Sequence, residues 1–348
     1  MISAQEVKNY SHELGIDDIR ITNAEPFEQA LAKHRDQSAE GLFIDNRDWR
    51  LRNIEHFYNV RATFPKARSI IAACQCYLTD ENTDFTEPGR PFGRIARYTW
   101  RNHYLDLRKK LQRIAQFLKK SHSAHSFVYS NGPIAEKPIA QRSGIGYYGK
   151  HSIIMNQVYG SWIVIGEIIT DLDIEYDAPL TIDCGDCREC MDACPTKAII
   201  RPYVIDRRLC IQELTNWYGI IPDAIARIWE NRLYGCTTCQ DVCPINKEVK
   251  PRIPQTKLGF VGSCLPLIDI LQMDEVEYRQ RFAHNQITAN WINFLSIQRN
   301  ALIALAHTKD KTTLSLLEQF SKHQDPVLSK TAKWAITYFL NNENNKKN

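Results

Sequence analysis

The chain has 348 residues, of which 43% are hydrophobic and 24% are charged, and its formal net charge is +4. This length predicts two or three domains, and the composition excludes a disordered or collagen-like protein. The small positive charge permits an anionic partner such as nucleic acid but does not argue for one. No apolar stretch is long enough to span a bilayer and no signal-peptide core begins the chain, so we expect a cytoplasmic protein with no membrane association.

The first 172 residues mix helix and strand signals, which predicts one αβ domain. Ser3-x-x-Glu6 is a capping box that opens a helix, and Gly15 can close it. A further helix is expected at 26–33, and strands are expected at 18–22, 69–77, 127–129 and 162–170. The clearest helix runs from 103 to 120, where four apolar residues recur at spacings of four, three and four: Leu107, Leu111, Ile114 and Leu118.

Eleven cysteines in a reducing compartment indicate metal binding or catalysis rather than disulfides. The first motif is Cys184-x2-Cys187-x2-Cys190-x3-Cys194-Pro, which is the bacterial ferredoxin spacing. In that spacing three thiolates hold one 4Fe–4S cluster, and the fourth cysteine binds the other cluster. The motif therefore predicts a two-cluster, ferredoxin-like module.

A second motif, Cys236-x2-Cys239-x3-Cys243-Pro, lacks the cysteine that a plain ferredoxin has three residues earlier. Cys210 is the expected replacement. The ferredoxin swap then gives two ligand sets: Cys184, Cys187, Cys190 and Cys243 for cluster one, and Cys194, Cys210, Cys236 and Cys239 for cluster two. Two structural zinc sites are the alternative, but zinc does not require C-x3-C-P at both ends.

The remaining cysteines are interpreted as structural. Cys74 and Cys76 lie on an expected strand, where small buried hydrophobic residues are the favoured interpretation over a redox role. Cys264 is isolated in the sequence.

Beyond residue 265 the pattern is helical, with helices expected at 291–306 and from Pro326 onward. About two helical hairpins fit there, in the manner of a short HEAT-like repeat. We therefore predict an α+β multidomain protein: an αβ domain over 1–172, a ferredoxin-like domain over 173–262 and a helical domain over 263–348.

Two clusters form a path for electron transfer. The sequence contains none of the common motifs for a cofactor or active site that would receive the electrons. There is no G-x-G-x-x-G after a strand, no phosphate-binding loop with Lys and Ser/Thr, no H-E-x-x-H helix and no G-x-S-x-G turn. The residues alone thus indicate an electron-transfer module joined to an αβ domain of unknown ligand.

Several segments resemble the epoxyqueuosine reductases, and together they extend from about residue 5 to 340. They are IARY at 95–98, GPIAEK at 132–137, GYYGKH at 146–151, GSW at 160–162, GE at 166–167, TD at 170–171, both cysteine motifs with NRLYGC at 231–236, and RNAL at 299–302.

The resemblance implies cobalamin held base-off in the first domain, two 4Fe–4S clusters that reduce it, and removal of the epoxide oxygen of epoxyqueuosine at the wobble position of tRNA to give queuosine. The implied partner is a tRNA with a queuosine-type anticodon. We expect a monomer, and no electron donor is identified.

The resemblance also implies the site residues. Ser130 stands where the family has its proton-donor aspartate, so Glu136 and Tyr98 are the other catalytic candidates. A hydroxyl is a poor acid near neutral pH, although it can order a water molecule that acts in its place. Candidate cobalamin contacts are Arg97, Ser130, Arg142, Lys150, His151, Ser152, Ser161 and Trp162.

Because of Ser130, two alternatives stay open. One is a cobalamin and iron–sulfur reductase of another substrate, similar to the reductive dehalogenases. The other is a non-catalytic homologue that transfers electrons or binds tRNA.

Overall fold

The computed structural model describes residues 2–44, 53–81 and 85–344. A four-stranded antiparallel sheet organises the N-terminal half, with its strands in the order β1 (Asp18–Asn23), β2 (Ser69–Cys76), β7 (Ile163–Thr170) and β4 (Ser126–Tyr129). All four strands were expected from the sequence. Every residue of β2 and β7 is buried, because helices cover both faces of the sheet.

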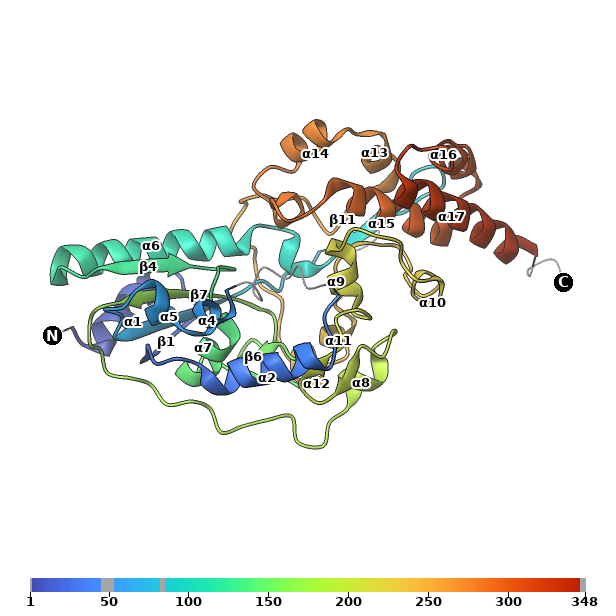
Figure 1. The fold of residues 1–348 in the computed structure, drawn as a ribbon. Coiled ribbons are helices and arrows are strands. Elements are labelled where there is room, and N and C mark those ends of the chain that lie inside the picture. Colours follow the sequence, from blue (N-terminus) through green and yellow to red (C-terminus); the bar gives the residue numbers. More distant parts are fainter. Residues whose placement is uncertain (1, 45–52, 82–84, 345–348) are drawn as a thin grey trace.

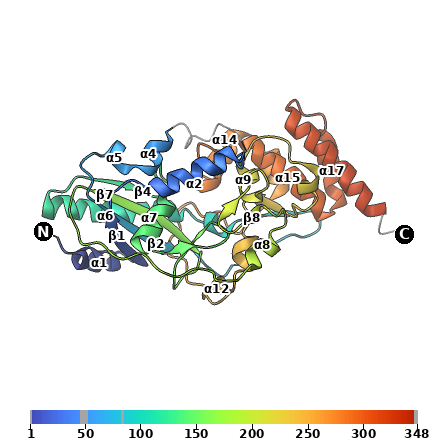
Figure 2. The same ribbon diagram turned by 60° about the horizontal axis from the view of Figure 1, so that its bottom comes forward.

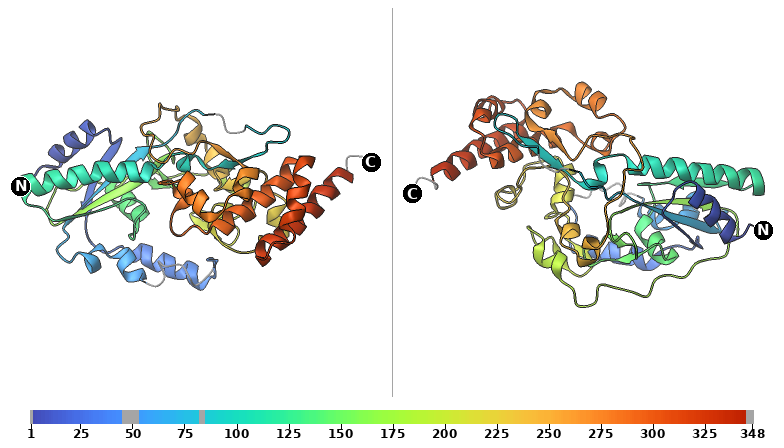
Figure 3. Two further views of the ribbon diagram at one scale, coloured as in Figure 1. Left: turned by 90° about the horizontal axis from the view of Figure 1, so that it is seen from above. Right: turned by 180° about the vertical axis from the view of Figure 1, so that it is seen from behind.

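The helices of this half lie on opposite faces of the sheet (Figures 1 and 3). One face packs against α1 (Ala4–Glu13) and α6 (His103–His122), and the four predicted apolar residues of α6 are fully buried there. The Ser3 side chain caps α1 by accepting the Glu6 N–H, as the capping box predicts. The other face carries α7 (Glu136–Ser143), with α2 (Glu28–Ala39), α4 (Ile54–Tyr58) and α5 (Val60–Thr63) beside it.

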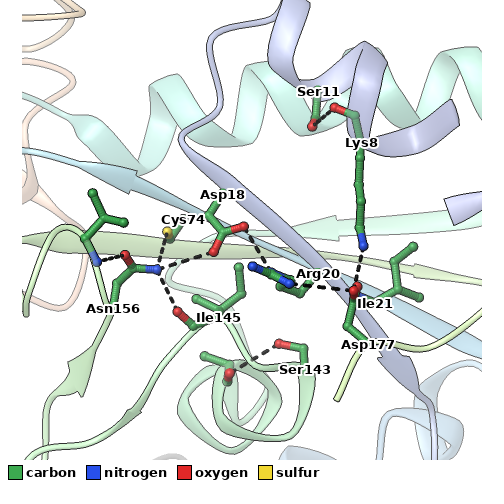
Figure 4. Close-up of polar contacts among 12 residues, drawn as sticks. Lys8, Ser11, Asp18, Arg20, Ile21, Cys74, Ser143, Ile145, Asn156 and Asp177 are labelled. Carbon is green, nitrogen blue, oxygen red and sulfur yellow. Dashed lines mark hydrogen bonds and ion pairs between the residues drawn. The ribbon is translucent and has the colours of Figure 1, made fainter. Parts of the chain in front are cut away.

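Polar contacts connect later segments of the chain to α1, β1 and β2 (Figure 4). Asp177 accepts hydrogen bonds from the Lys8 amine at 2.6 Å and from the Ile21 N–H at 2.9 Å. The Asn156 amide donates to the Ile145 carbonyl at 2.7 Å and lies 3.9 Å from the Cys74 sulfur. Cys74 and Cys76 are both buried, which confirms the prediction for them.

The chain then leaves β7 and runs beneath the sheet, through 171–188, to the cysteine-bearing segments (Figure 1). These segments contain only short elements. They are α8 (Glu189–Ala193), β8 (Ile199–Arg201), β9 (Val204–Ile205), α9 (Ile211–Asn216), α10 (Asp223–Ala226), β10 (Arg232–Tyr234), α11 (Thr238–Asp241) and α12 (Pro244–Lys247). The hairpin of β5 (Tyr147–Tyr148) and β6 (Ile154–Met155) precedes them in the αβ half.

A second sheet joins three segments that are far apart in the sequence. Its central strand is β3 (Phe92–Ile95), which pairs with β10 on one side and with β11 (Cys264–Pro266) on the other. Gly93 is required at the centre of this sheet, since a Cβ there would lie 2.8 Å from the Leu233 Cβ. None of these three strands was expected from the sequence.

The C-terminal part is helical, and it lies at the opposite end of the molecule from the N-terminus (Figures 1 and 2). Its elements are α13 (Leu267–Gln272), α14 (Glu275–Arg281), η2 (Gln286–Thr288), α15 (Phe294–Thr308), η3 (Lys311–Thr313), α16 (Leu314–Phe320) and α17 (Pro326–Asn344). Helix α15 begins three residues later than expected, because the Asn293 side chain caps it at the Leu295 N–H. Within the described ranges, none of the helices has the length and apolar character needed to traverse a bilayer.

Candidate active site and cysteine module

The cysteine thiols lie in two neighbouring groups, and both come from separate short helices and loops. Burial raises the pKa of the Cys190 thiol to about 11, and the nearby thiols of Cys184, Cys187 and Cys243 add to that shift. Cys190 lies in α8, whereas Cys243 precedes α12, so the fold brings the last cysteine of the second motif to the first motif.

The second group has Cys239 at its centre. Burial raises the pKa of this thiol, with further contributions from Cys236, Cys210, Cys190 and Cys194 in that order. The Cys210 thiol is raised to about 11 by burial, and Cys236 is the thiol that adds to it. Cys210 therefore does lie with the second motif, although twenty-five residues separate it from Cys236 in the sequence.

The neighbours of Cys190 and Cys239 are compatible with the ligand sets expected from the ferredoxin spacing, and those sets stay a prediction. In the described part of the chain, no three His, Cys, Asp or Glu side chains gather tightly enough to hold a single metal ion. Eight thiols in two adjoining groups of four are the donor set that a pair of 4Fe–4S clusters requires.

Lys150 has a position that the sequence did not indicate. Its amine donates to the carbonyl oxygens of Gly185 and Cys187, the latter at 2.8 Å. A cation thus holds the loop of the first cysteine motif. The resemblance implies Lys150 as a cobalamin contact, and in this structure its amine binds the loop of the first cysteine motif.

An amide network joins the second cysteine motif to the start of β7. The Asn246 side chain accepts from the Ser161 N–H and donates to the Ser161 hydroxyl, both at 2.8 Å. The Gln240 amide donates to the same hydroxyl and to the Tyr77 hydroxyl, both at 3.0 Å. The Trp162 indole donates to the Asn246 carbonyl at 3.3 Å. All of these bonds are buried, so the cysteine module is fixed to the sheet.

Aromatic and basic residues surround this network. The Arg97 guanidinium lies 5.0 Å from the Trp100 ring and 5.8 Å from the Trp162 ring. Tyr98 accepts a hydrogen bond from the Gln212 amide at 2.8 Å, and burial raises the pKa of its hydroxyl to about 12. A tyrosine with so high a pKa keeps its proton at neutral pH, and it can donate a hydrogen bond but is a weak acid.

His103 lies at the start of α6, next to Tyr77, with their rings 5.9 Å apart. It is buried, its Nδ1 has no hydrogen-bond partner in the described structure, and burial lowers its pKa to about 4. It is therefore a neutral ring with a free polar atom. Sequence reasoning missed this residue, because a single histidine carries no motif.

Ser130 and Glu136 lie together where β4 ends and α7 begins. The Ser130 hydroxyl donates to the Ile165 carbonyl at 2.8 Å, so its proton is already engaged. The Glu136 carboxylate accepts the Gly132 N–H at 2.9 Å, within the turn that follows Ser130. Burial raises the pKa of Glu136 to about 7.

The other expected contacts are more scattered. Arg142 stacks on the Phe27 ring at 3.4 Å and donates to the Glu25 carbonyl, at the far end of α7 from Glu136. His151 is buried and its pKa is lowered to about 4 by burial. The Ser152 carbonyl accepts from Lys137 at 2.8 Å.

Two family models match the chain. The model described as "4Fe-4S double cluster binding domain" matches residues 183–246, and the one described as "Epoxyqueuosine reductase QueG, DUF1730" matches residues 58–130. The curated epoxyqueuosine reductase of Bacillus subtilis is 33% identical over 340 residues, which is 95% of this chain and 86% of that protein. That of Escherichia coli is 30% identical, covering 98% of this chain and 90% of that protein.

The chain belongs to the epoxyqueuosine reductase family. Solved structures of family members are also similar to this chain. An epoxyqueuosine reductase with an epoxyqueuosine-modified tRNA-Tyr stem loop has 32% identity and a TM-score of 0.88, covering 96% of this chain and 89% of that one. The enzyme of Streptococcus thermophilus has 27% identity and a TM-score of 0.87, covering 97% and 90%.

Epoxyqueuosine reductases use two 4Fe–4S clusters and cobalamin, and the residues described above fit both. The thiol groups suit the clusters. The Tyr77 and Trp162 rings offer apolar surface to a large planar ring, and the unpaired His103 nitrogen is a polar group that a bound molecule could satisfy. One B. subtilis epoxyqueuosine reductase structure has its catalytic loop swung out of the active site. The resemblance noted in the sequence implies that Ser130 stands at the position of the family's aspartate.

Proposed function

We propose that this protein reduces epoxyqueuosine to queuosine in tRNA, with cobalamin that is reduced through two 4Fe–4S clusters. The observation that carries the proposal is the continuous likeness to an epoxyqueuosine reductase that binds the modified stem loop, over 96% of this chain. A tRNA with a queuosine-type anticodon is thus the macromolecular partner.

The grouping of the thiols supports the proposed assignment of the cluster ligands. Cluster one takes Cys184, Cys187, Cys190 and Cys243, and cluster two takes Cys194, Cys210, Cys236 and Cys239. Cobalamin, when bound, supplies a strongly reducing centre at the substrate. Arg97, Tyr98, Ser161 and Trp162 would hold it against the sheet, since they surround the place where the second cysteine motif meets β7.

The organisation of the chain belongs to the same proposal. An αβ domain over 1–172 would hold cobalamin, 173–262 would hold the clusters, and 263–348 would form HEAT-like hairpins. A tRNA substrate places the protein in the cytoplasm.

Ser130 favours a second candidate, a reductase of the same architecture with another substrate. The family's aspartate would protonate the leaving oxygen, and a serine hydroxyl that donates to the Ile165 carbonyl does not replace that acid. The two candidates share their cofactors and differ only in what is reduced.

Anaerobic turnover separates them. The protein, loaded with both clusters and cobalamin, is given a strong reductant and tRNA carrying epoxyqueuosine, and the nucleosides are analysed by mass spectrometry. We expect conversion to queuosine. Absence of conversion by fully loaded protein would exclude the first candidate and support the second.

A further inference from the structure

A buried carboxyl group lies on the sheet beneath α7 and has no role in the contacts described so far. Glu167 is in β7, opposite Tyr129 of β4, and it is fully buried. Neither of its carboxyl oxygens has a hydrogen-bond partner among the described residues. Its same-face neighbours Ile165 and Ile169 are apolar and belong to the core on this side. An ionised carboxylate is very costly in such a place, so the group is protonated at neutral pH.

Glu136 is the acidic neighbour of Glu167. Burial raises the pKa of Glu167 well above its usual range, and the charge of Glu136 raises it further. The pKa of Glu136 is raised to about 7 by burial, while the N–H groups of Gly132 and Asn131 and the charge of Lys137 act in the opposite direction.

Few other charges reach this pair. Lys137 is exposed and its amine binds the Ser152 carbonyl. On the α6 side, Tyr104 is near enough for the Glu136 charge to raise its pKa, and burial keeps that hydroxyl protonated. Near neutral pH the two carboxyls thus hold at least one proton and at most two.

The pair is adjacent to the position where the family has its aspartate. Tyr129 is the strand partner of Glu167, and Ser130 is the next residue. The turn after Ser130 donates its Gly132 N–H to Glu136. Glu136 is only partly buried, whereas Glu167 is fully buried. One carboxyl therefore faces the Ser130 loop, and the other lies behind it.

The reaction requires protons from some residue. Removal of an epoxide oxygen as water, which leaves a carbon–carbon double bond, consumes two electrons and two protons. The clusters deliver the electrons, but Ser130 has no acidic proton to give. Resting on the function proposed above, we propose that Glu136 donates a proton to the leaving oxygen and that Glu167 is a positioning residue that holds a second proton behind it.

In this step the O–H bond of Glu136 breaks and an O–H bond forms on the leaving oxygen. Glu136 remains as a carboxylate. The two carboxyl groups are not hydrogen-bonded to each other in this structure, so a side-chain movement brings them together before the proton of Glu167 passes to Glu136. Glu136 then donates this proton in turn, and the second O–H bond forms on the oxygen as it leaves as water. Solvent then restores the pair through Glu136, which is the accessible member. Two protons leave the pair for each oxygen released as water, so the balance closes.

The first test does not depend on the substrate. Infrared difference spectra of the loaded protein without tRNA are recorded across the neutral range for the parent, Glu136→Gln and Glu167→Gln. We expect a carbonyl band of protonated carboxyl groups that each substitution diminishes, and that a control substitution at the exposed Glu13, Glu13→Gln, leaves unchanged. Identical spectra for the parent and both variants would show an ionised pair and overturn the proposal.

The second test uses turnover. Glu136→Gln should lower kcat by about 100-fold, the range of general-acid catalysis, with little change in KM for tRNA. Adding Ser130→Asp to it should restore much of the rate, because a carboxyl group is then present at the aspartate position. Full activity of Glu136→Gln, in a preparation whose parent converts epoxyqueuosine, would refute this inference alone, whereas an inactive parent would refute the proposed function.

Glu167→Gln has a separate signature in the pH profile. The parent pair keeps one proton well above neutral pH, because the second proton is held more tightly. In Glu167→Gln no second carboxyl group keeps a proton once Glu136 has lost its own, so the alkaline fall in kcat should move to lower pH in this variant. A merely structural role for Glu167 would lower the rate at every pH without moving the profile, and that result would contradict the proposal.

Discussion

At the scale of single residues, Ser130 is the position at which the resemblance implies a loss of the family's proton-donor aspartate. Its hydroxyl proton is directed to the Ile165 carbonyl, which leaves only the oxygen lone pairs for a water molecule or a substrate hydroxyl. The residues around it are otherwise family-like, as in the GPIAEK segment that follows. A water molecule ordered by Ser130 can therefore pass a proton from Glu136 toward the substrate.

Replacing Ser130 by aspartate tests this interpretation. Ser130→Asp should raise kcat for epoxyqueuosine in tRNA several-fold, because it restores a carboxyl acid where the parent relies on an ordered water. The measurement is single-turnover mass spectrometry of the nucleosides, with Ser130→Ala as the control that only removes the hydroxyl. An unchanged or lower rate for the aspartate variant would count against the ordered water.

Lys150 supports a prediction about the clusters. Its amine lies on the carbonyls of Gly185 and Cys187, so it places a positive charge beside cluster one. Reduction adds negative charge to a cluster, and a nearby cation favours it. Lys150→Met should lower the potential of cluster one by an amount on the order of tens of millivolts. An anaerobic redox titration followed by electron paramagnetic resonance measures the shift.

The matched control for that titration is Lys330→Met, an exposed lysine of α17 in the C-terminal helical part. Equal potentials in the parent and in Lys150→Met would show that the lysine serves only to anchor the loop.

At the scale of elements, long periodic segments could be predicted and short paired ones could not. Helix α6 followed from four apolar residues on one face, and β2 and β7 followed from runs of β-prone residues. Strands β3, β10 and β11 have three or four residues each and owe their existence to partners far away in the chain. The local sequence pattern does not show which distant segment a short strand will pair with.

The site divides in the same way. The two cysteine motifs and the position of Cys210 beside the second one could be predicted from the sequence, because the ferredoxin motif is itself a spacing rule. The sequence did not indicate the positions of Glu167 and His103 or the bond of Lys150 to the loop of the first cysteine motif. These features depend on burial and on contacts between distant segments. The strand position of Glu167 was the one available signal, since an acid within a buried apolar run is expensive.

The amide network between α12 and β7 also yields a prediction. Asn246 is buried and bonds to the Ser161 N–H, the Ser161 hydroxyl and the Gln240 carbonyl. Asn246→Ala leaves these groups unpaired, so it should destabilise the folded protein by about 2 to 4 kcal/mol. Thermal unfolding of the loaded protein under nitrogen should show a lower midpoint, whereas Asn290→Ala, at an exposed asparagine, should not. Equal midpoints would mean that the network contributes little.

At the scale of the whole molecule, the small sheet holds the three parts of the chain together. Strand β3 comes from the first half, β10 leads directly to Cys236, and β11 opens the helical part. Arg299 of α15 strengthens the same junction, because its guanidinium donates to the carbonyls of Trp217, Gly219 and Leu214. The helical part is thereby joined to the segment that follows Cys210.

Gly93 tests that junction. In Gly93→Ala the new methyl group would meet Leu233 and Leu267, so β3 must move away from its neighbours at a cost of about 1 to 3 kcal/mol. We expect a lower unfolding midpoint and less iron bound per protein after reconstitution, because β10 positions Cys236. Gly89→Asn is the control, since that glycine has open space and a left-handed backbone that asparagine tolerates. Normal iron content in Gly93→Ala would separate the sheet from cluster binding.

The placement of β11 has a consequence for how the protein is made. All eight cysteines proposed as cluster ligands precede residue 264, so they leave the ribosome before the strand that completes the small sheet. Contacts between such distant segments form late in folding. Biosynthesis therefore provides an interval in which the thiols are complete but the junction is still open, and iron and sulfide can be delivered to them then. Closure by β11 and α15 would follow as the last step and trap the finished clusters.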